Sequence, residues 1–237
     1  MSFLDGLYAY EVILLGLGVL LFLVLVVCLA ARIFRGQSFA GLLLFFAVPI
    51  VMISYPGLQS VEIGSNGVKL TKELAALEKD PQNDSLRASV ELTLADLSSR
   101  PISNPKLSVS MARAQIALGN DSAAEAQLDK TLQESPKSQG ALELKNRINL
   151  DRSLADLTKR VEDNPTDTAA KTMLDSTARE VAQQPLASPK TMLNLARAKT
   201  ALGNQEEAKA YLDTVLAIDS NLTTAADELK KRLFGTP

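Results

Sequence analysis

Four basic residues occur in two matching pairs, and their spacing could serve the recognition of an anion. Lys106 and Arg113 are seven residues apart, and so are Lys190 and Arg197. Residues seven apart lie on nearly the same face of an α-helix, so each pair would present two cations side by side. Such a basic ladder could bind an acidic peptide or a C-terminal carboxylate. The alternative is a solvated helix face, which is what charged helix faces usually are.

The sequence lacks the residues that common catalytic and metal-binding sites need. The chain has no histidine and one cysteine, Cys28, which lies in a long apolar run. This composition excludes nucleophile pairs that use histidine, histidine-bound metals and intramolecular disulfides. A thiol inside an apolar run is also a poor nucleophile. We therefore expect no enzyme activity, no catalytic residue, no metal and no cofactor.

The basic pairs belong to a tandem duplication. Residues 111–120 read MARAQIALGN and residues 195–204 read LARAKTALGN, an offset of 84 residues (195 minus 111). One copy spans residues 67–150 and the other spans residues 151–234. The same offset relates several prolines and leucines: Pro81 and Pro165, Pro101 and Pro185, Pro105 and Pro189, Leu128 and Leu212, and Leu132 and Leu216. Descent from one unit could therefore explain the two basic pairs, and an internal repeat is the strongest guide to architecture.

Helical periodicity and helix-end signals alternate through both copies. One helix is predicted from an N-cap at Asp84, with apolar positions at Leu86, Val90, Leu94 and Leu97. Asn104 and Ser188 each precede a proline, which suits the first position of a helix. Gly119 and Gly203 supply the left-handed conformation that ends a helix. We expect helices throughout, with one long helix or two abutting ones joining the copies.

The helical units resemble the tetratricopeptide repeat (TPR). The positions that match the family's spacing are Ala112, Gly119, Ala124, Leu128, Leu132 and Pro136 in residues 103–136, and Ala196, Gly203, Ala208, Leu212 and Leu216 in residues 187–220. The family's usual aromatic residues on the first helix are absent, and Ser220 replaces the final proline. The resemblance implies an α-solenoid, because such helical hairpins bury a core only by stacking. It also implies that the helices with the two basic pairs line a concave, peptide-binding surface.

Two apolar runs precede the duplicated part. Residues 12–31 carry no charge and are long enough to cross a bilayer at about 1.5 Å per residue. Residues 39–55 are near the short limit, and Pro49 is predicted to interrupt their helix. We expect residues 1–58 to form a transmembrane helical hairpin. An anchor is favoured over a channel, because neither run holds the charged residues that ion paths usually need.

The connection between the two runs carries Arg32 and Arg35, whereas no basic residue precedes the first run. The positive-inside rule therefore favours a cytoplasmic location for residues 32–38. The N-terminus and the repeat domain, residues 71–237, would then lie in the periplasm of a bacterial inner membrane. Tyr8, Tyr10 and Tyr55 would lie at the outer interface. A cytoplasmic repeat domain is the alternative.

Residues 59–70 have the pattern of a β-hairpin linker. Residues 61–63 and 68–70 alternate with period two on either side of Asn66-Gly67, a pair that tolerates the positive φ of a tight turn. A two-stranded hairpin is only marginally stable alone. It could rest on the repeats, pair with another subunit, or serve as a linker. The linker or packing role is favoured.

These expectations combine into a membrane-anchored, TPR-like scaffold or adaptor that binds another protein or peptide in an envelope complex. Its expected partners are proteins in or at the membrane and the lipid bilayer. The 25 basic and 27 acidic residues give no reason to expect nucleic acid. One alternative is a structural subunit that assembles through the transmembrane hairpin, including as a homo-oligomer. Another is an assembly chaperone resembling the cytochrome c maturation factors, whose longer cytoplasmic loop is missing here.

Overall fold

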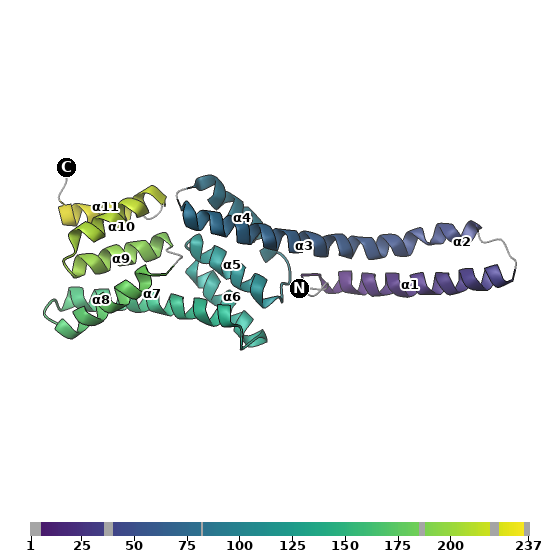
Figure 1. Ribbon diagram of the computed structural model, residues 1–237, viewed down its shortest axis with the longest axis horizontal. Helices are drawn as coiled ribbons and strands as arrows, with labels where there is room; N and C mark the ends of the chain where they lie inside the picture. The colour runs from purple at the N-terminus through teal and green to yellow at the C-terminus, as the bar shows by residue number, and fades with distance from the viewer. Residues whose placement is uncertain (1–5, 36–39, 82, 185–187, 219–222, 235–237) are drawn as a thin grey trace. The chain divides into compact units, whose positions relative to one another are not determined.

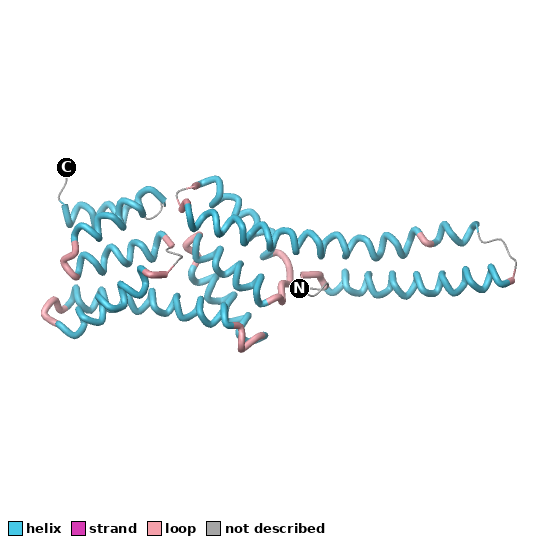
Figure 2. Tube along the Cα trace, in the orientation of Figure 1, coloured by secondary structure: helices cyan, strands magenta, loops and turns pink. Residues whose placement is uncertain are grey.

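The computed structural model of the chain describes residues 6–35, 40–81, 83–184, 188–218 and 223–234, and its regular elements there are all helical (Figure 1, Figure 2). The prediction of an all-α protein is confirmed. The helices are α1 Ala9–Phe34, α2 Ala40–Phe45, α3 Ala47–Lys79, α4 Asp84–Ser98, α5 Pro105–Ala117, α6 Asp121–Glu134, α7 Gln139–Asp163, α8 Thr168–Ala182, α9 Pro189–Ala201, α10 Gln205–Ile218 and α11 Thr223–Phe234. Residues 36–38 of the predicted cytoplasmic loop, and positions 187 and 220 of the predicted second repeat, lie outside the described residues.

Contacts within the chain divide it into two units. The first unit comprises residues 1–69 together with residues 95–104, and the second comprises residues 70–94 and 105–237. Helices α3 and α4 each contribute residues to both units. A short segment of the duplicated part, residues 95–104, therefore packs with the apolar helices.

In the first unit, α1 lies antiparallel to α2 and the first part of α3 (Figure 1). Gly18 permits a close approach, because a Cβ atom there would lie 3.0 Å from Met52 Cβ and 3.0 Å from Ile53 Cγ1. Phe22 and Phe46 pack edge to face with ring centroids 5.5 Å apart. That geometry is favoured between aromatic rings. The two apolar runs thus pack directly against each other.

The second apolar run is divided into two helices near Pro49. Proline lacks the N–H that would bond to the carbonyl of Phe45, so α2 ends at Phe45 and α3 begins at Ala47. Pro49 then lies in the first turn of α3, where N–H groups have no partner within the helix. The interruption predicted for Pro49 is therefore present.

Two stretches, Ala9–Phe34 and Gly41–Lys79, are long and apolar enough to cross a membrane. Few of their side chains are buried within the protein. Val27 and Val51, for example, keep 68% and 67% of their surface exposed. A continuous apolar surface of this size marks contact with a membrane or with another protein.

The prediction of a β-hairpin at residues 59–70 is wrong, because these residues lie inside α3. The buried residues of this part of α3 are spaced by four and three, as one helical face requires: Ile63, Gly67, Leu70, Leu74 and Leu77. Val61 and Val68, the other two apolar residues of the alternating pattern, are exposed. Burial of the helical face outweighs the roughly 1 kcal/mol that each glycine costs inside a helix.

Helix boundaries match between the two copies. Helices α4, α5, α6 and α7 begin at residues 84, 105, 121 and 139, and α8, α9, α10 and α11 begin at residues 168, 189, 205 and 223, each 84 residues later. The ends of α3, α4, α5 and α6 match those of α7, α8, α9 and α10 by the same offset. α7 is one continuous helix of 25 residues, so a single long helix spans the boundary between residues 150 and 151. Because α3 and α7 end 84 residues apart, the structural repeat also includes the later part of α3; from here on, the first copy means α3 to α6 and the second copy means α7 to α10.

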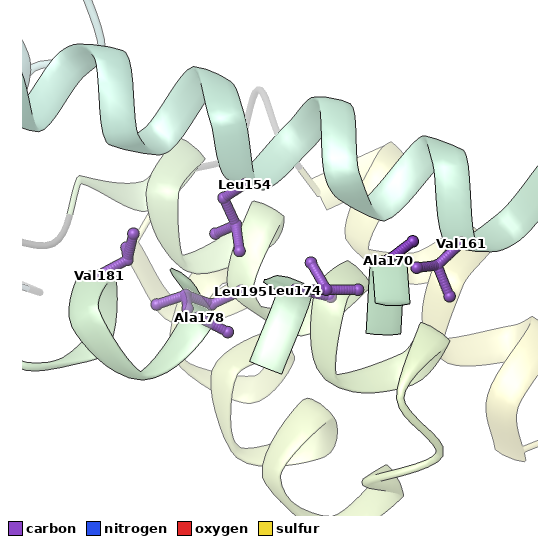
Figure 3. Packing of buried hydrophobic residues seen from close by; sticks show 8 residues of the cluster. Leu154, Val161, Ala170, Leu174, Ala178, Val181 and Leu195 are labelled. Atoms are coloured by element: carbon purple, nitrogen blue, oxygen red, sulfur yellow. The ribbon is translucent and has the colours of Figure 1, made fainter. Parts of the chain in front are cut away.

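Among the described residues, the apolar core of the second unit includes three clusters that share helices. The first joins α5, α6 and α7 around Ala112 and Leu128. The second joins α7, α8 and α9 around Leu154 and Leu174, which are fully buried (Figure 3). The third joins α9, α10 and α11 around Leu212. Because α7 and α9 each belong to two clusters, the core continues through the unit.

The α5–α6 and α9–α10 turns have the same geometry. Gly119 and Gly203 adopt φ values of +83° and +82°. The following N–H groups reach back five residues, from Asn120 to the Gln115 carbonyl at 2.7 Å and from Asn204 to the Lys199 carbonyl at 2.8 Å. These bonds satisfy carbonyls that the helix end would otherwise leave without partners.

Side-chain caps begin several of the helices. Ser188 Oγ accepts the Thr191 N–H at 3.1 Å, so the predicted start of α9 is confirmed. At α4, the Oδ1 atom of Asn83 accepts the Leu86 N–H at 3.1 Å. Asn83 is therefore the cap, and the predicted Asp84 is the first residue of the helix.

Candidate functional site

A cleft of about 180 Å³ lies in the second unit where the two copies meet. Its walls are the α5–α6 turn, the middle of α7, the end of α8 and the start of α9. The polar residues that line this junction cleft are Asp121, Arg147, Asp151, Arg152, Gln184, Lys190, Thr191 and Asn194. Pockets for drug-sized ligands measure about 300–1,000 Å³, so the junction cleft suits a single side chain.

A wider hollow of about 600 Å³ extends along α7 and α8. The residues that define this α7 groove are Glu143, Asn146, Arg147, Asn149, Leu150, Ser153, Glu180 and Gln184. Arg147, Leu150 and Gln184 line both hollows. The junction cleft and the α7 groove therefore adjoin, and Arg147 lies at their boundary.

Two cations at the junction cleft are paired with carboxylates of the first copy. Lys190 Nζ lies 2.7 Å from Asp121 Oδ2, and Arg152 Nη2 lies 2.9 Å from Glu125 Oε2. Both pairs are partly exposed, and such pairs contribute about 0–1 kcal/mol. They connect α9 and the second half of α7 to the start and body of α6.

Asp151 is the carboxylate that lies deepest in the junction cleft. Burial raises its pKa, because removal from water disfavours the charged form. A 3.5 Å hydrogen bond from Asn194 and the nearby Lys190 lower the pKa in part, while Asp121 raises it further. Its Oδ1 atom is buried and accepts no hydrogen bond from the described residues. The charge of Asp151 is therefore incompletely compensated.

Arg147 is a half-buried cation one helical turn before Asp151 on α7. Burial lowers its pKa, the carboxylates of Asp151 and Glu78 raise it, and the neighbouring Arg113 lowers it again. The loss of hydration thus outweighs the attraction of the two carboxylates. Charged groups perturbed in this way within a cleft are candidates for binding.

The four residues of the predicted basic ladder are all exposed, on α5 and α9. Lys190 lines the junction cleft and is already paired with Asp121. Arg113 is close enough to Arg147 to affect its pKa. Lys106 and Arg197 are not among the residues that line the junction cleft or the α7 groove. A joint role for the four in binding stays a prediction.

Arg147 and Asp151 were not among the predicted site residues, although the duplication contains a signal for them. The corresponding residues of the first copy, 84 positions earlier, are Ile63 and Gly67. An apolar residue and a glycine of α3 thus correspond to two charged residues of α7, a helix that ends at the matching position. This difference between corresponding residues marks positions that are polar in only one of the two copies.

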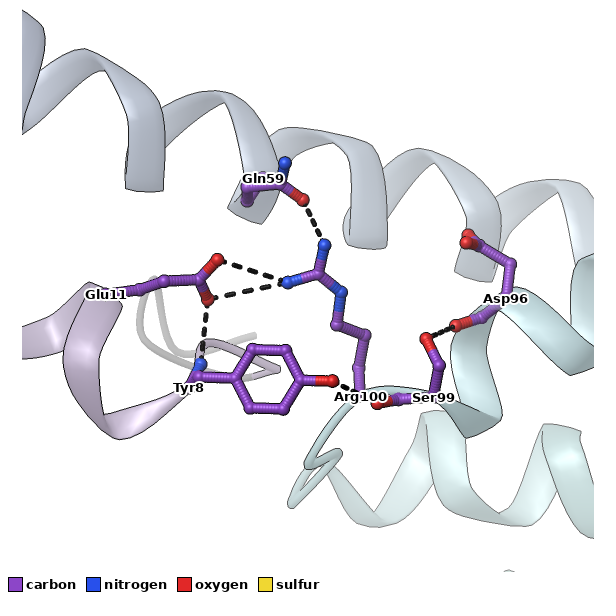
Figure 4. A network of polar contacts seen from close by, with 6 residues as sticks. All are labelled: Tyr8, Glu11, Gln59, Asp96, Ser99 and Arg100. Carbon is purple, nitrogen blue, oxygen red and sulfur yellow. Dashed lines mark hydrogen bonds and ion pairs between the residues drawn. The ribbon is translucent and has the colours of Figure 1, made fainter.

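The first unit contains a polar network that sequence patterns also did not reveal (Figure 4). Glu11 has no exposed surface; its carboxylate lies 3.2 Å from Arg100 Nη1 and accepts the Tyr8 N–H at 2.8 Å. Arg100 also donates to Gln59 Oε1 at 2.5 Å and lies over the Tyr8 ring. Tyr8 Oη donates to the Ser99 carbonyl at 2.5 Å. The lone carboxylate at the start of an apolar helix was a signal that a cation must face it.

No family model, characterised protein or solved structure matches this chain. Among the described residues, no group of three or more histidine, cysteine, aspartate or glutamate side chains is placed to hold a metal ion. The residues that line the two hollows can form hydrogen bonds, ion pairs and apolar contacts.

Proposed function

We propose that this protein is a membrane-anchored scaffold whose TPR-like solenoid binds another protein or peptide of an envelope complex. In this proposal α1, α2 and the first part of α3 form the transmembrane hairpin, and the duplicated helices form the solenoid. The two apolar stretches support the anchor. The matching helix boundaries of the two copies and the shared core clusters support the repeat architecture.

The observation that carries the binding role is the pair of hollows around Arg147. The junction cleft combines apolar walls with polar groups, which is the usual composition of binding sites, and the α7 groove beside it is lined mostly by polar side chains around Leu150. They also hold two half-buried charged residues, Arg147 and Asp151, whose pKa values are shifted by burial. The fold alone does not require a charge at these two positions, so recognition of a partner best explains the charged side chains.

The proposed topology places the repeat domain and the N-terminus in the periplasm, with residues 32–38 in the cytoplasm. Arg32 and Arg35 at the end of α1 support this orientation through the positive-inside rule. The aromatic pair Tyr8 and Tyr10, stacked at 5.6 Å near the start of α1, suits the opposite membrane interface.

Site-specific crosslinking in native membranes tests the binding role. A photo-reactive benzoylphenylalanine replaces Asn149, which is exposed and lines the α7 groove. The matched control carries the same group at Gln133, which is exposed on α6 and lines neither hollow. We expect a discrete protein adduct from position 149 and none from position 133.

The same experiment can contradict the proposal. Adducts of equal yield from both positions, or none from position 149, would count against a partner at these hollows. An adduct that contains two copies of this chain would replace the scaffold with a self-assembling subunit, and the mass of the full chain in detergent would check that result.

A further inference from the structure

In the first copy, the place that corresponds to the α7 groove is occupied by the chain's own N-terminal segment. Gly6 lies against α3, because a Cβ atom there would be 2.7 Å from Ile63 Cδ1. Tyr8 bonds to the Ser99 carbonyl, and Glu11 pairs with Arg100 (Figure 4). Residues 6–11 thus pack between α3 and the segment that follows α4.

The contact with residues 6–11 involves Ile63, Ser99 and Arg100. Arg147 and Gln184 lie 84 positions after Ile63 and Arg100, and both line the α7 groove, whereas Gln183, the counterpart of Ser99, does not. Three residues beside the contact, Gln59, Asn66 and Asp96, correspond in the same way to Glu143, Leu150 and Glu180 of the α7 groove. The α7 groove is therefore the second copy's version of a surface that, in the first copy, holds an extended segment leading into a helix.

The replacements indicate which chemistry the α7 groove would select. In the first copy the occupant's carboxylate, Glu11, is held by Arg100. In the second copy Gln184 stands in place of Arg100, and the cation has moved to α7, where Arg147 stands in place of Ile63. A half-buried guanidinium is best satisfied by a carboxylate, which it can bind through two hydrogen bonds.

The rest of the lining limits how much negative charge the occupant can carry. Glu143 and Glu180 are exposed members of the α7 groove and would repel acidic residues that flank the one bound to Arg147. Leu150 offers an apolar contact where the first copy has Asn66. The complementary segment therefore has one carboxylate among uncharged and apolar neighbours.

We propose that the α7 groove binds a partner's extended segment at the start of a helix, in the manner of residues 6–11, with one carboxylate held by Arg147. This inference rests on the proposed function and names the chemistry of its partner. The intramolecular contact of the first copy supplies the binding geometry, and the charge on α7 supplies the specificity.

A peptide titration tests this inference on the full chain in detergent. The probe is an acetylated, fluorescently labelled peptide that copies residues 6–11 (GLYAYE) and continues into an alanine- and glutamine-rich helix. A second peptide has glutamine in place of the glutamate. We expect the glutamate peptide to bind about tenfold more tightly, because hydrogen bonds to an ionised group are the stronger ones. Fluorescence anisotropy measures both affinities.

Two variants decide whether Arg147 is responsible. Arg147→Met keeps an apolar stem and should remove the preference for the glutamate peptide. Arg160→Met, on the same helix, paired with Asp167 and outside the residues that line either hollow, should leave it unchanged. Circular dichroism checks that both variants keep the helical content of the parent chain.

The inference would be overturned by equal binding of the two peptides, by no binding of either, or by a preference that survives Arg147→Met. These failures are distinguishable from failure of the proposed function. A specific adduct from position 149, together with equal binding of the two peptides, would support the scaffold and contradict the recognition of an acidic segment. Absence of both the adduct and the peptide preference would contradict both proposals.

Discussion

At the scale of single residues, Glu11 and Arg100 form an ion pair in which the loss of one partner would be costly. The Glu11 carboxylate is fully buried, while the Arg100 side chain keeps 20% of its surface exposed. Two buried charges gain little net stability from pairing, since both lose hydration. Removal of one partner is different, because the remaining charge stays buried without compensation. Arg100 is therefore needed mainly because Glu11 is present.

Arg100→Ala should accordingly destabilise the full chain by about 3–5 kcal/mol, the usual cost of leaving one buried charge unpaired. The double variant Glu11→Gln with Arg100→Gln should recover most of that loss. Arg179→Ala is the control, because Arg179 forms an exposed pair with Asp175 that is worth about 0.3–0.5 kcal/mol. Denaturant unfolding in detergent measures all three. An Arg100→Ala effect no larger than that of Arg179→Ala would contradict a buried pair.

At the scale of elements, α4 and α8 are capped by different residues at the same position of the two copies. Asn83 caps α4, and Asp167, 84 positions later, caps α8 by accepting the Ala170 N–H at 2.9 Å. Asp167 also accepts hydrogen bonds from Arg160. Both interactions favour the carboxylate, so the pKa of Asp167 is lowered, with the backbone bond as the larger cause.

A lowered pKa in the folded state gives α8 a pH-dependent cap. The stabilisation from Asp167 is present above the ordinary pKa of an aspartate, about 3.9, and is lost as the pH falls through the lower, folded value. Asp167→Asn should therefore lower the unfolding temperature at pH 7 and have little effect near pH 2. The reverse change in the first copy, Asn83→Asp, is the comparison. Thermal melts at the two pH values measure the difference, and an Asp167→Asn effect of the same size at both would refute the linkage.

At the scale of the whole molecule, the proposed orientation in the membrane predicts the compartment of a partner. In the proposed topology, two spans place the N-terminus and the repeat domain on the same side. The arginines at the end of α1 favour the periplasm for both. A partner of the α7 groove would then be a periplasmic protein or the periplasmic part of a membrane protein.

Reporter fusions test this orientation. Alkaline phosphatase fused after Pro237 should be active, because it folds in the periplasm, and a fluorescent protein fused there through the same export route should stay dark. Fusions after Arg35 should give the opposite pattern. A fluorescent fusion after Pro237 would place the repeat domain in the cytoplasm and refute the proposed topology.

The sequence by itself determined most helix boundaries of the duplicated part. Proline after a capping residue and glycine at a helix end act within a few residues, so Ser188 and Gly119 do the same in the folded chain as in the sequence. The tertiary structure decided what depends on distant residues. Residues 59–70 became helical because one helical face of α3 is buried, although their local pattern was that of a strand pair.

Local sequence patterns likewise did not predict the candidate site. Glu11 and Arg100 are 89 residues apart in sequence, and the Lys190 and Asp121 of the junction cleft are 69 apart. Periodicity shows which face of a helix is apolar, but it does not show which charged side chains of other helices will lie opposite. The duplication relates the positions of the two surfaces by 84 residues. Only the fold revealed that residues 6–11 pack against the first, while the second has a groove with Arg147 in place of Ile63.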